Sequence, residues 1–305
     1  MRTCHRVWAW PRALLGAVAL LLVLTACGPG SSATPVTHAS SSASAATSGS
    51  TAPTASTPAP SASSPKVPSA SPSAPPATRP VVVGLGDSVT SGYGCDCETF
   101  VQLYAAQLPP AKGGPARPVN LGKGGTTSVD LLRDLRTDAT TRHDVARADV
   151  VLVTIGANDL TPLLRRWLAS DCDSTCYDGA VGAVGRRIGA IVRQIHLLRG
   201  DAPQQVLVTG YWNVFVDGEV GRQEHGGAYL RWSDRLTRVL NDRICAAASA
   251  AGARCVHLYP AFKSSTGDRD PTPLLASDGD HPDAKGHEVI ARTLLAATRP
   301  VRSGP

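Results

Sequence analysis

A serine near the start of the expected folded part of the chain and a histidine near its end could together perform nucleophilic catalysis. Ser88 lies in Gly-Asp-Ser-Val at 86–89, directly after an apolar run, and His281 closes Asp-Gly-Asp-His at 278–281. A serine hydroxyl attacks a carbonyl when an imidazole removes its proton and a carboxylate fixes that imidazole's tautomer. Ser88, His281 and Asp278 therefore supply a nucleophile, a base and an orienting carboxylate, a combination that predicts ester hydrolysis.

Two further segments could stabilise the anion formed during such a reaction. The phrase Asn-Leu-Gly-Lys-Gly-Gly at 120–125 offers flexible glycine backbone ahead of a helix, where an N–H group can point at an anion. The phrase Gly-Ala-Asn-Asp at 156–159 presents Asn158, whose amide can donate to the same point. A tetrahedral intermediate needs two or three such donors.

Apolar runs and helical patterns alternate from residue 80 onward. Short, β-branched runs predict strands at 81–85, 118–121, 150–155, 205–209 and 255–258. Three- and four-residue spacing of apolar positions predicts helices at 100–108, 128–138, 181–198, 229–251 and 284–297. This order predicts a doubly wound, flavodoxin-like α/β domain with a mostly parallel five-stranded sheet. Ligands of such sheets bind beyond the carboxyl ends of the strands, where each of the four phrases lies.

Taken together, the four phrases resemble the SGNH hydrolase superfamily, also called the GDSL esterase/lipase family, in its own order. The resemblance implies that Ser88 is the nucleophile and the first oxyanion donor, that Asn158 is another donor, and that His281 is the base oriented by Asp278. Gly125 is the remaining donor by spacing, with Gly122 as the alternative. Val89 stands where the family has leucine, and Gly124 where serine is frequent.

Six cysteines of the domain predict three disulfides, because an even number follows an export signal. Cys245 and Cys255 are expected to pair. Cys95 and Cys97 are close enough in sequence for a mutual bridge to be strained, so we expect them to pair with Cys172 and Cys176. The spacings lack the usual zinc-ligand pairs, so no metal is expected.

The first 27 residues read as a lipoprotein signal peptide. A basic start precedes an apolar stretch that ends in Leu-Thr-Ala-Cys at 24–27. This ending resembles the bacterial lipobox, which implies a diacylglycerol on Cys27; the alternatives are ordinary secretion or a short membrane anchor. Residues 28–79 are expected to form a disordered tether, since 43 of the 49 residues at 31–79 are Ser, Ala, Pro or Thr. Residues 80–305 form the hydrolase domain.

The net charge of +6 does not indicate nucleic-acid binding. Residues 1–79 hold five basic and no acidic residues, which leaves 25 basic against 24 acidic residues in the domain. A nearly neutral domain without a basic run excludes an electrostatic nucleic-acid partner.

The sequence thus predicts a lipid-anchored, monomeric esterase or lipase on the outer side of the cell membrane, which uses no cofactor. Removal of O-acetyl groups from carbohydrate or cell-wall glycan is the alternative within the same chemistry, and a non-catalytic surface-binding lipoprotein is the alternative from another class. Tyr-Trp-Asn-Val-Phe at 211–215 could line the substrate pocket or pack in the core, and the segment 163–179 could form a lid or rim.

Overall fold

A computed structural model describes residues 79–298 except 112, 173–175 and 203. In this part of the chain the strands form one five-stranded sheet with the order β2-β1-β3-β4-β5, and every neighbouring pair is parallel. The strands are β1 (Val81–Gly86), β2 (Arg117–Asn120), β3 (Val150–Thr154), β4 (Gln205–Thr209) and β5 (Arg254–Val256). The predicted α/β fold is therefore confirmed.

The three central strands are apolar because both faces of the sheet are covered. All five residues of β3 are buried, and so are the last five of β1 and the last four of β4. Val83 of β1 lies in register between Val119 of β2 and Val151 of β3. A parallel sheet buried on both sides reads as such continuous runs of Val and Leu rather than as an alternating pattern.

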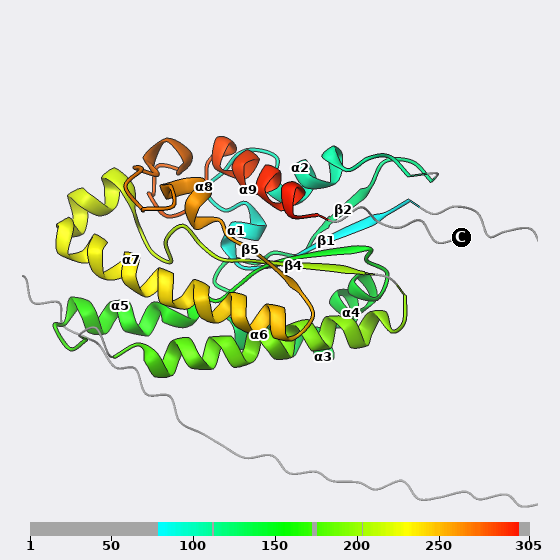
Figure 1. Cartoon of the computed structure of the whole chain (residues 1–305), viewed down its shortest axis with the longest axis horizontal. Helices are drawn as coiled ribbons and strands as arrows, with labels where there is room; N and C mark the ends of the chain where they lie inside the picture. Colours follow the sequence, from blue (N-terminus) through cyan, green and yellow to red (C-terminus); the bar gives the residue numbers. More distant parts are fainter. Residues whose placement is uncertain (1–78, 112, 173–175, 203, 299–305) are drawn as a thin grey trace, which may run out of the picture. The chain divides into compact units, whose positions relative to one another are not determined.

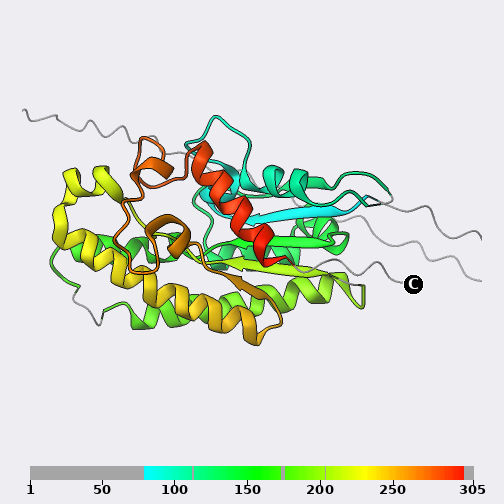
Figure 2. The same ribbon diagram turned by 45° about the horizontal axis from the view of Figure 1, so that its top comes forward.

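Helices cover both faces (Figure 1 and Figure 2). The longer α6 and α7 run along one side with α3, and α2 and α9 run along the other. The described helices are α1 (Ser88–Ser91), α2 (Phe100–Gln107), α3 (Ser128–Thr137), α4 (Ala139–Ala146), α5 (Thr161–Leu168), α6 (Asp178–Arg199), α7 (Gly218–Ala250), α8 (Tyr259–Lys263) and α9 (Ala284–Ala297), with 3₁₀ turns η1 (Asn158–Leu160) and η2 (Thr272–Leu274).

The predicted helices are present, but several short ones were not expected. The helices α1, α4, α5 and α8 are four to eight residues long, too short for a clear periodic pattern. The helix α7 begins at Gly218, eleven residues before the predicted start, and Gly226 interrupts it with φ 78°. A residue with positive φ breaks the helical repeat, and for this reason the apolar spacing begins only after it.

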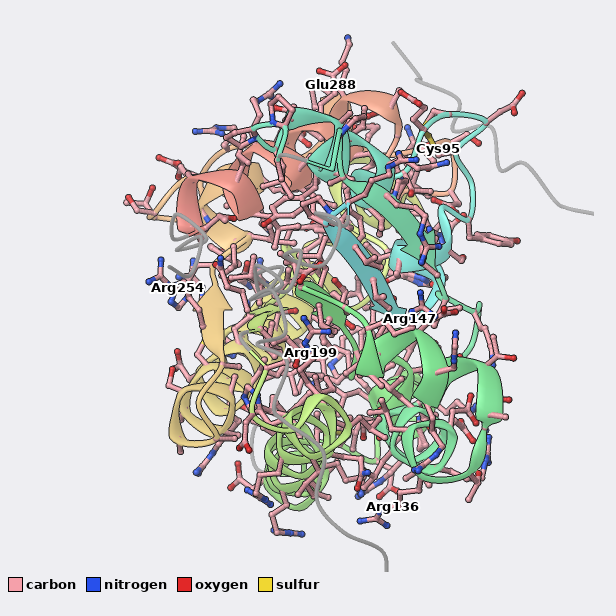
Figure 3. The ribbon with its side chains drawn as sticks, turned by 90° about the vertical axis from the view of Figure 1, so that its right-hand side faces the viewer. Cys95, Arg136, Arg147, Arg199, Arg254 and Glu288 are labelled. Carbon is pink, nitrogen blue, oxygen red and sulfur yellow. A yellow bond between two sulfur atoms is a disulfide. The ribbon has the colours of Figure 1, made fainter. Side chains whose placement is uncertain are left out.

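The strands share one direction, so the sheet has two chemically different ends. Figure 3 views the molecule from the amino ends of the strands, where Arg147 and Arg199 lie. Arg199 pairs there with Asp149, whose second carboxylate oxygen accepts the N–H of Val81 at the start of β1. The carboxyl ends lie on the opposite side, where the sequence predicts the catalytic residues.

The six cysteines of the domain form three disulfides, but not all in the expected pairs. The expected Cys245–Cys255 bridge is present. The expectation that Cys95 and Cys97 pair with Cys172 and Cys176 is wrong, because Cys95 bonds Cys97 and Cys172 bonds Cys176. The Cα atoms of Cys95 and Cys97 lie 5.2 Å apart, within the usual range for a disulfide. An open turn therefore accommodates a bridge that sequence separation alone argued against.

The predicted leader with Cys27, and all but the last residue of the predicted tether, lie outside the described residues. Among the helices that are described, none combines the length and the apolar character needed to cross a membrane.

Candidate active site

Ser88 is the first residue of α1 and follows β1 through a tight turn. Gly86 has φ 148°, and a Cβ atom there would lie 2.0 Å from the carbonyl oxygen of Thr154, so only glycine fits. Asp87 caps α1 by accepting the N–H of Val89 at 3.0 Å. The turn therefore holds the serine at the carboxyl end of β1, at the start of a helix.

The structure brings Ser88, His281 and Asp278 into one chain of hydrogen bonds. Nε2 of His281 lies 2.8 Å from the Ser88 hydroxyl, and Nδ1 lies 2.7 Å from Oδ2 of Asp278. The Asp278 carboxylate accepts a hydrogen bond from an N–H at Nδ1, a tautomer that leaves the lone pair on Nε2, which faces the serine. The arrangement can therefore take the proton of the serine hydroxyl.

The loop that carries Asp278 and His281 is held in place by hydrogen bonds to its own backbone. Oδ1 of Asp278 accepts the N–H groups of Asp280 and His281, each at 3.0 Å. Gly279 has φ 67°, and a Cβ atom there would meet the side chain of Val220 at 2.6 Å. Although burial acts to raise the pKa of Asp278, the two N–H groups and His281 outweigh it and lower that pKa. Asp278 thus stays ionised, as an orienting carboxylate must.

The glycines of the phrase at 120–125 differ in whether their N–H groups are already hydrogen-bonded. The N–H of Gly122 donates to Oδ1 of Asn120 at 2.9 Å, and a Cβ atom at Gly122 would lie 2.4 Å from the Ser91 nitrogen. Gly122 thus allows close packing on α1 and has no free donor. In the described part of the chain the N–H groups of Gly124 and Gly125 have no acceptor, and Gly125 has φ 75°. The geometry leaves these two as candidate oxyanion donors and removes Gly122.

The other two predicted donors lie at element starts. The N–H of Ser88 opens α1 and has no acceptor within the helix. Asn158 opens the 3₁₀ turn η1 after β3, and its amide donates one hydrogen to the carbonyl of Thr126 at 3.0 Å. Because a side-chain amide has two donors, the second remains for a substrate oxygen. The bond to Thr126 also ties Asn158 to the glycine phrase.

A buried polar network that the sequence analysis missed supports these donors. Asp159 accepts the N–H of Ser128 at 2.8 Å and its hydroxyl at 2.7 Å, and Arg187 bonds the same carboxylate at 2.9 Å. The guanidinium of Arg187 also donates to the hydroxyl of Ser128 at 2.6 Å. The network locks η1 to the start of α3, so Asn158 and the glycine phrase keep their spacing. The sequence signal for this network is the Asn-Asp pair at 158–159 after a strand, but that pair does not identify Arg187 on α6 as the partner of Asp159.

Asp87 makes a second buried contact, to the aromatic segment after β4. The hydroxyl of Tyr211 donates to Oδ2 of Asp87 at 2.6 Å and accepts the N–H of Ala157 at 3.4 Å. Burial raises the pKa of Asp87 to about 6, against the lowering effect of the Tyr211 and Val89 hydrogen bonds. Burial and the neighbouring carboxylate raise the pKa of Tyr211 well above its usual value, so the tyrosine keeps its proton and remains the donor.

A cavity of about 190 Å³ opens beside the serine and the histidine. It is lined by Asp87, Ser88, Val89, Ala157, Asn158, Thr161, Leu164, Tyr211, Trp212, Asn213, Val214, Phe215, Asp280 and His281. The segment 211–215 is buried and lines the cavity, so the two interpretations of that segment both hold. Among the described residues of the segment 163–179, Leu164 lines the cavity, while Trp167 packs against Tyr229 and Trp232.

Two clusters of cysteine and histidine come close enough together to suggest a metal site. Cys95, Cys97 and His287 form one, and Cys245, Cys255 and His257 form the other. In both clusters the cysteines are joined in a disulfide and offer no thiolate, so these residues do not fit a bound ion.

Comparison with known proteins agrees with this geometry. The profile of the GDSL-like lipase/acylhydrolase family matches residues 85–289. YpmR of Bacillus subtilis (strain 168), an uncharacterized protein, is 25% identical over 222 residues, which cover 72% of this chain and 81% of YpmR.

Two solved structures share the fold. The lipase Lip_vut3 from a goat rumen metagenome superposes with a TM-score of 0.59 at 21% identity, covering 72% of this chain and 97% of the lipase. A single-residue variant of Axe2, an acetyl-xylooligosaccharide esterase from Geobacillus stearothermophilus, gives a TM-score of 0.50 at 19% identity, covering 75% of this chain and 99% of the esterase. By its matching profile, its fold and the order of its site residues, the chain belongs to the GDSL-like lipase/acylhydrolase family of ester hydrolases.

Proposed function

We propose that this protein is a serine esterase that cleaves small carboxylic esters through an acyl-enzyme intermediate. The observation that carries the proposal is the continuous hydrogen-bonded chain from Asp278 through His281 to the Ser88 hydroxyl, at the wall of a cavity. The other features of the site supply what such a reaction needs: fixed donors for an oxyanion and a buried, positioned loop for the nucleophile.

In the first half-reaction the Ser88 hydroxyl attacks the ester carbonyl carbon while Nε2 of His281 takes its proton. The carbonyl oxygen becomes an oxyanion that accepts hydrogen bonds from the N–H of Ser88, the N–H of Gly125 and the free amide hydrogen of Asn158. His281 then gives the proton to the leaving alcohol oxygen, and the C–O bond of the ester breaks. Asp278 holds the imidazole and stabilises its charged form throughout.

In the second half-reaction water replaces the alcohol. His281 takes a proton from the water as its oxygen attacks the acyl carbon, and returns that proton to Ser88 as the acid leaves. All proton transfers use His281, and the chain's own residues supply every group required. The proposal therefore includes neither a metal nor an organic cofactor.

The size of the cavity, which has to hold parts of both the acyl and the alcohol portion, favours small esters over long-chain ones. Its volume of about 190 Å³ is small beside the roughly 300–1,000 Å³ of typical ligand pockets. A short-chain carboxylesterase is the main proposal, and a lipase would have to place most of a long chain outside this cavity. Removal of O-acetyl groups from carbohydrate is the second candidate, because the lining includes the polar groups Asp280, Asn158 and Asn213.

We also propose that the enzyme acts outside the cell as a monomer, held to the membrane by a lipid on Cys27 and separated from it by the tether 28–79. The sequence supports the anchor and the tether, because a basic and apolar leader ends in Leu-Thr-Ala-Cys and is followed by a segment rich in Ser, Ala, Pro and Thr. Three disulfides in the domain agree with an oxidising location.

Hydrolysis of p-nitrophenyl esters from acetate to decanoate by the purified protein tests the proposal. Ser88→Ala is expected to abolish turnover, and Asn158→Ala to lower kcat by about 10²–10³, the usual cost of one oxyanion donor. Ser249→Ala is the matched control, since that serine is exposed near the end of α7 and does not line the cavity. Unchanged turnover in Ser88→Ala would end the esterase proposal, and no turnover of any ester by the wild type would favour the non-catalytic lipoprotein. A rate that rises toward decanoate would overturn the short-chain assignment, and acetate release from acetylated glycan would favour the second candidate.

A further inference from the structure

The substrate cavity contains a carboxylate that the proposed reaction does not use. Two carboxyl groups, those of Asp87 and Asp280, line the cavity, and none of its lining residues is a lysine or arginine. The Asp87 carboxylate is occupied, because it accepts hydrogen bonds from the Val89 N–H and the Tyr211 hydroxyl. In the described part of the structure the Asp280 carboxylate has neither a hydrogen-bond donor nor an ion-pair partner; the residue's N–H donates to Asp278.

The surroundings of Asp280 make an unpartnered carboxylate costly. Burial raises the pKa of Asp280 to about 6, and the nearby carboxylates of Asp278 and Asp217 add to the rise, while His281 acts against it. Asp280 is half-buried, and reduced access to solvent makes the charged form of a carboxylate less favourable unless a partner compensates it. An apolar side chain here would line the cavity without that cost, so a structural explanation for Asp280 is lacking.

Lys263, which is buried, and Arg187, which is half-buried, are already engaged by other carboxylates. Nζ of Lys263 lies 2.8 Å from the carboxylate of Asp217 and 3.1 Å from that of Asp234. Arg187 is bonded to Asp159 at 2.9 Å. Neither cation is available to Asp280, and the cavity lining holds no lysine or arginine, so a cation that pairs with this carboxylate would have to enter with the substrate.

We propose that Asp280 recognises a positively charged group of the ester substrate, an inference that rests on the proposed esterase function. The aromatic residues Tyr211, Trp212 and Phe215 line the same cavity, and aromatic rings attract cations as a carboxylate does. A neutral chain would leave the carboxylate uncompensated, and an anionic substituent would be repelled by it. A cation satisfies both parts of the lining.

The position of Asp280 assigns the cation to the alcohol portion of the ester. His281 must reach both the serine hydroxyl and the leaving alcohol oxygen, so the alcohol lies on the histidine side of Ser88. Asp280 precedes His281 in the chain and faces the same cavity. The substrate class is thus an ester of a short alcohol that carries an ammonium group near the ester oxygen.

The test compares two esters of the same shape and different charge. Acetylcholine carries a quaternary ammonium, and 3,3-dimethylbutyl acetate replaces its nitrogen with carbon. For the wild type, kcat/KM is expected to be at least about tenfold higher for acetylcholine, because an ion pair in a partly desolvated cavity is stronger than in water. In Asp280→Asn the ratio should fall to about one, and in Asp280→Glu it should be retained in part. The ratio within one variant cancels any common effect of the substitution on His281.

Asp242→Asn is the matched control, because it removes one carboxylate from an exposed position on α7 and should keep the wild-type ratio. A wild-type ratio near one, or a ratio unchanged in Asp280→Asn, would overturn the assignment; the first measurement needs no variant. A preference for 2-hydroxyethyl acetate over propyl acetate without a preference for acetylcholine would also overturn it. If p-nitrophenyl acetate is hydrolysed and the wild-type kcat/KM ratio of acetylcholine to 3,3-dimethylbutyl acetate is near one, only this inference fails. If p-nitrophenyl acetate is not hydrolysed, the esterase proposal fails with it.

Discussion

Replacing Tyr211 by phenylalanine should destabilise the protein in a manner that depends on the ionisation of Asp87. The tyrosine hydroxyl donates to a carboxylate that is buried below the nucleophile, at 2.6 Å, and the other described donor to that carboxylate is the N–H of Val89. Tyr211→Phe removes one of two hydrogen bonds from a group with almost no access to solvent. The carboxylate is expected to respond by binding its proton more tightly.

The magnitude follows from the pKa of Asp87, which the fold raises from 3.8 to about 6. Because the folded protein binds this proton more tightly than the unfolded chain, stability from this group is greatest below about pH 4 and is lost as pH rises through about 6. A hydrogen bond to a charged group contributes about 1.5–3 kcal/mol, and one between neutral groups about 0.5–1.5 kcal/mol. Tyr211→Phe should therefore cost about 1 kcal/mol more at pH 8 than at pH 5, and should raise the pKa of Asp87 by about one further unit.

Urea denaturation at pH 5 and pH 8 measures this difference. Wild type, Tyr211→Phe, Asp87→Asn and the double variant form a cycle in which the interaction between the two residues is isolated. In the Asp87→Asn background the cost of Tyr211→Phe should be equal at both pH values. An equal cost at both pH values in the wild-type background as well would refute the reasoning, because it would show that Tyr211 does not sense the charge of Asp87.

Two further predictions concern stability, and urea denaturation at pH 7 checks both. Lys263→Met should lower the free energy of unfolding by about 3–5 kcal/mol, because the side chains of Lys263 and Asp217 are 8% and 4% exposed and the buried carboxylate would lose its partner. Adding Asp217→Asn to Lys263→Met should recover part of that loss. If the two substitutions lower the free energy of unfolding by fully additive amounts, the ion-pair explanation is contradicted. Gly122→Ala should lower the free energy of unfolding by about 1–3 kcal/mol, because the added Cβ would meet the backbone of α1. Gly124→Ala should be tolerated, because a Cβ atom there has open space around it. Equal effects of the two substitutions would show that Gly122 does not pack closely against α1 in solution.

The sheet could be predicted from the sequence because its central strands are apolar throughout and the intervening helices repeat at helical spacing. The side chains of the proposed active site could be predicted because each phrase follows a strand, and parallel strands bring their carboxyl ends together. Which glycine offers a free N–H could not be predicted, since three of them lie within four residues. That choice depends on a hydrogen bond between Gly122 and Asn120, which only the folded turn shows.

Long-range polar contacts were the other part that the sequence could not supply. The contact of Tyr211 with Asp87 joins residues 124 positions apart, and the pair of Arg187 with Asp159 spans 28 positions. No local pattern encodes such pairs, because periodicity reports only which face of an element is buried. The disulfides show the opposite case, in which long-range pairs were expected and local ones formed. Cys95 bonds Cys97 through a turn whose geometry could not be inferred from the sequence spacing.

The two halves of the site are held by separate networks that meet at the serine. On the oxyanion side, Asn158 is tied to the glycine phrase through Thr126, and Asp159 locks the same two elements together with Arg187. On the base side, the N–H of Asp217 donates to the carbonyl of Gly279, so the buried ion pair with Lys263 supports the loop between Asp278 and His281.

The turn that holds Ser88 connects these halves through Asp87. Its carboxylate caps α1 and accepts the Tyr211 hydroxyl, which in turn accepts the N–H of Ala157 beside Asn158. The nucleophile is thus positioned relative to the oxyanion donor by a short chain of hydrogen bonds that does not pass through His281. The proposed reaction requires the attacked carbonyl to contact the serine hydroxyl and the oxyanion donors at the same time. A hydrogen-bond chain that fixes Ser88 relative to Asn158 without His281 keeps that geometry while His281 gains and loses its proton.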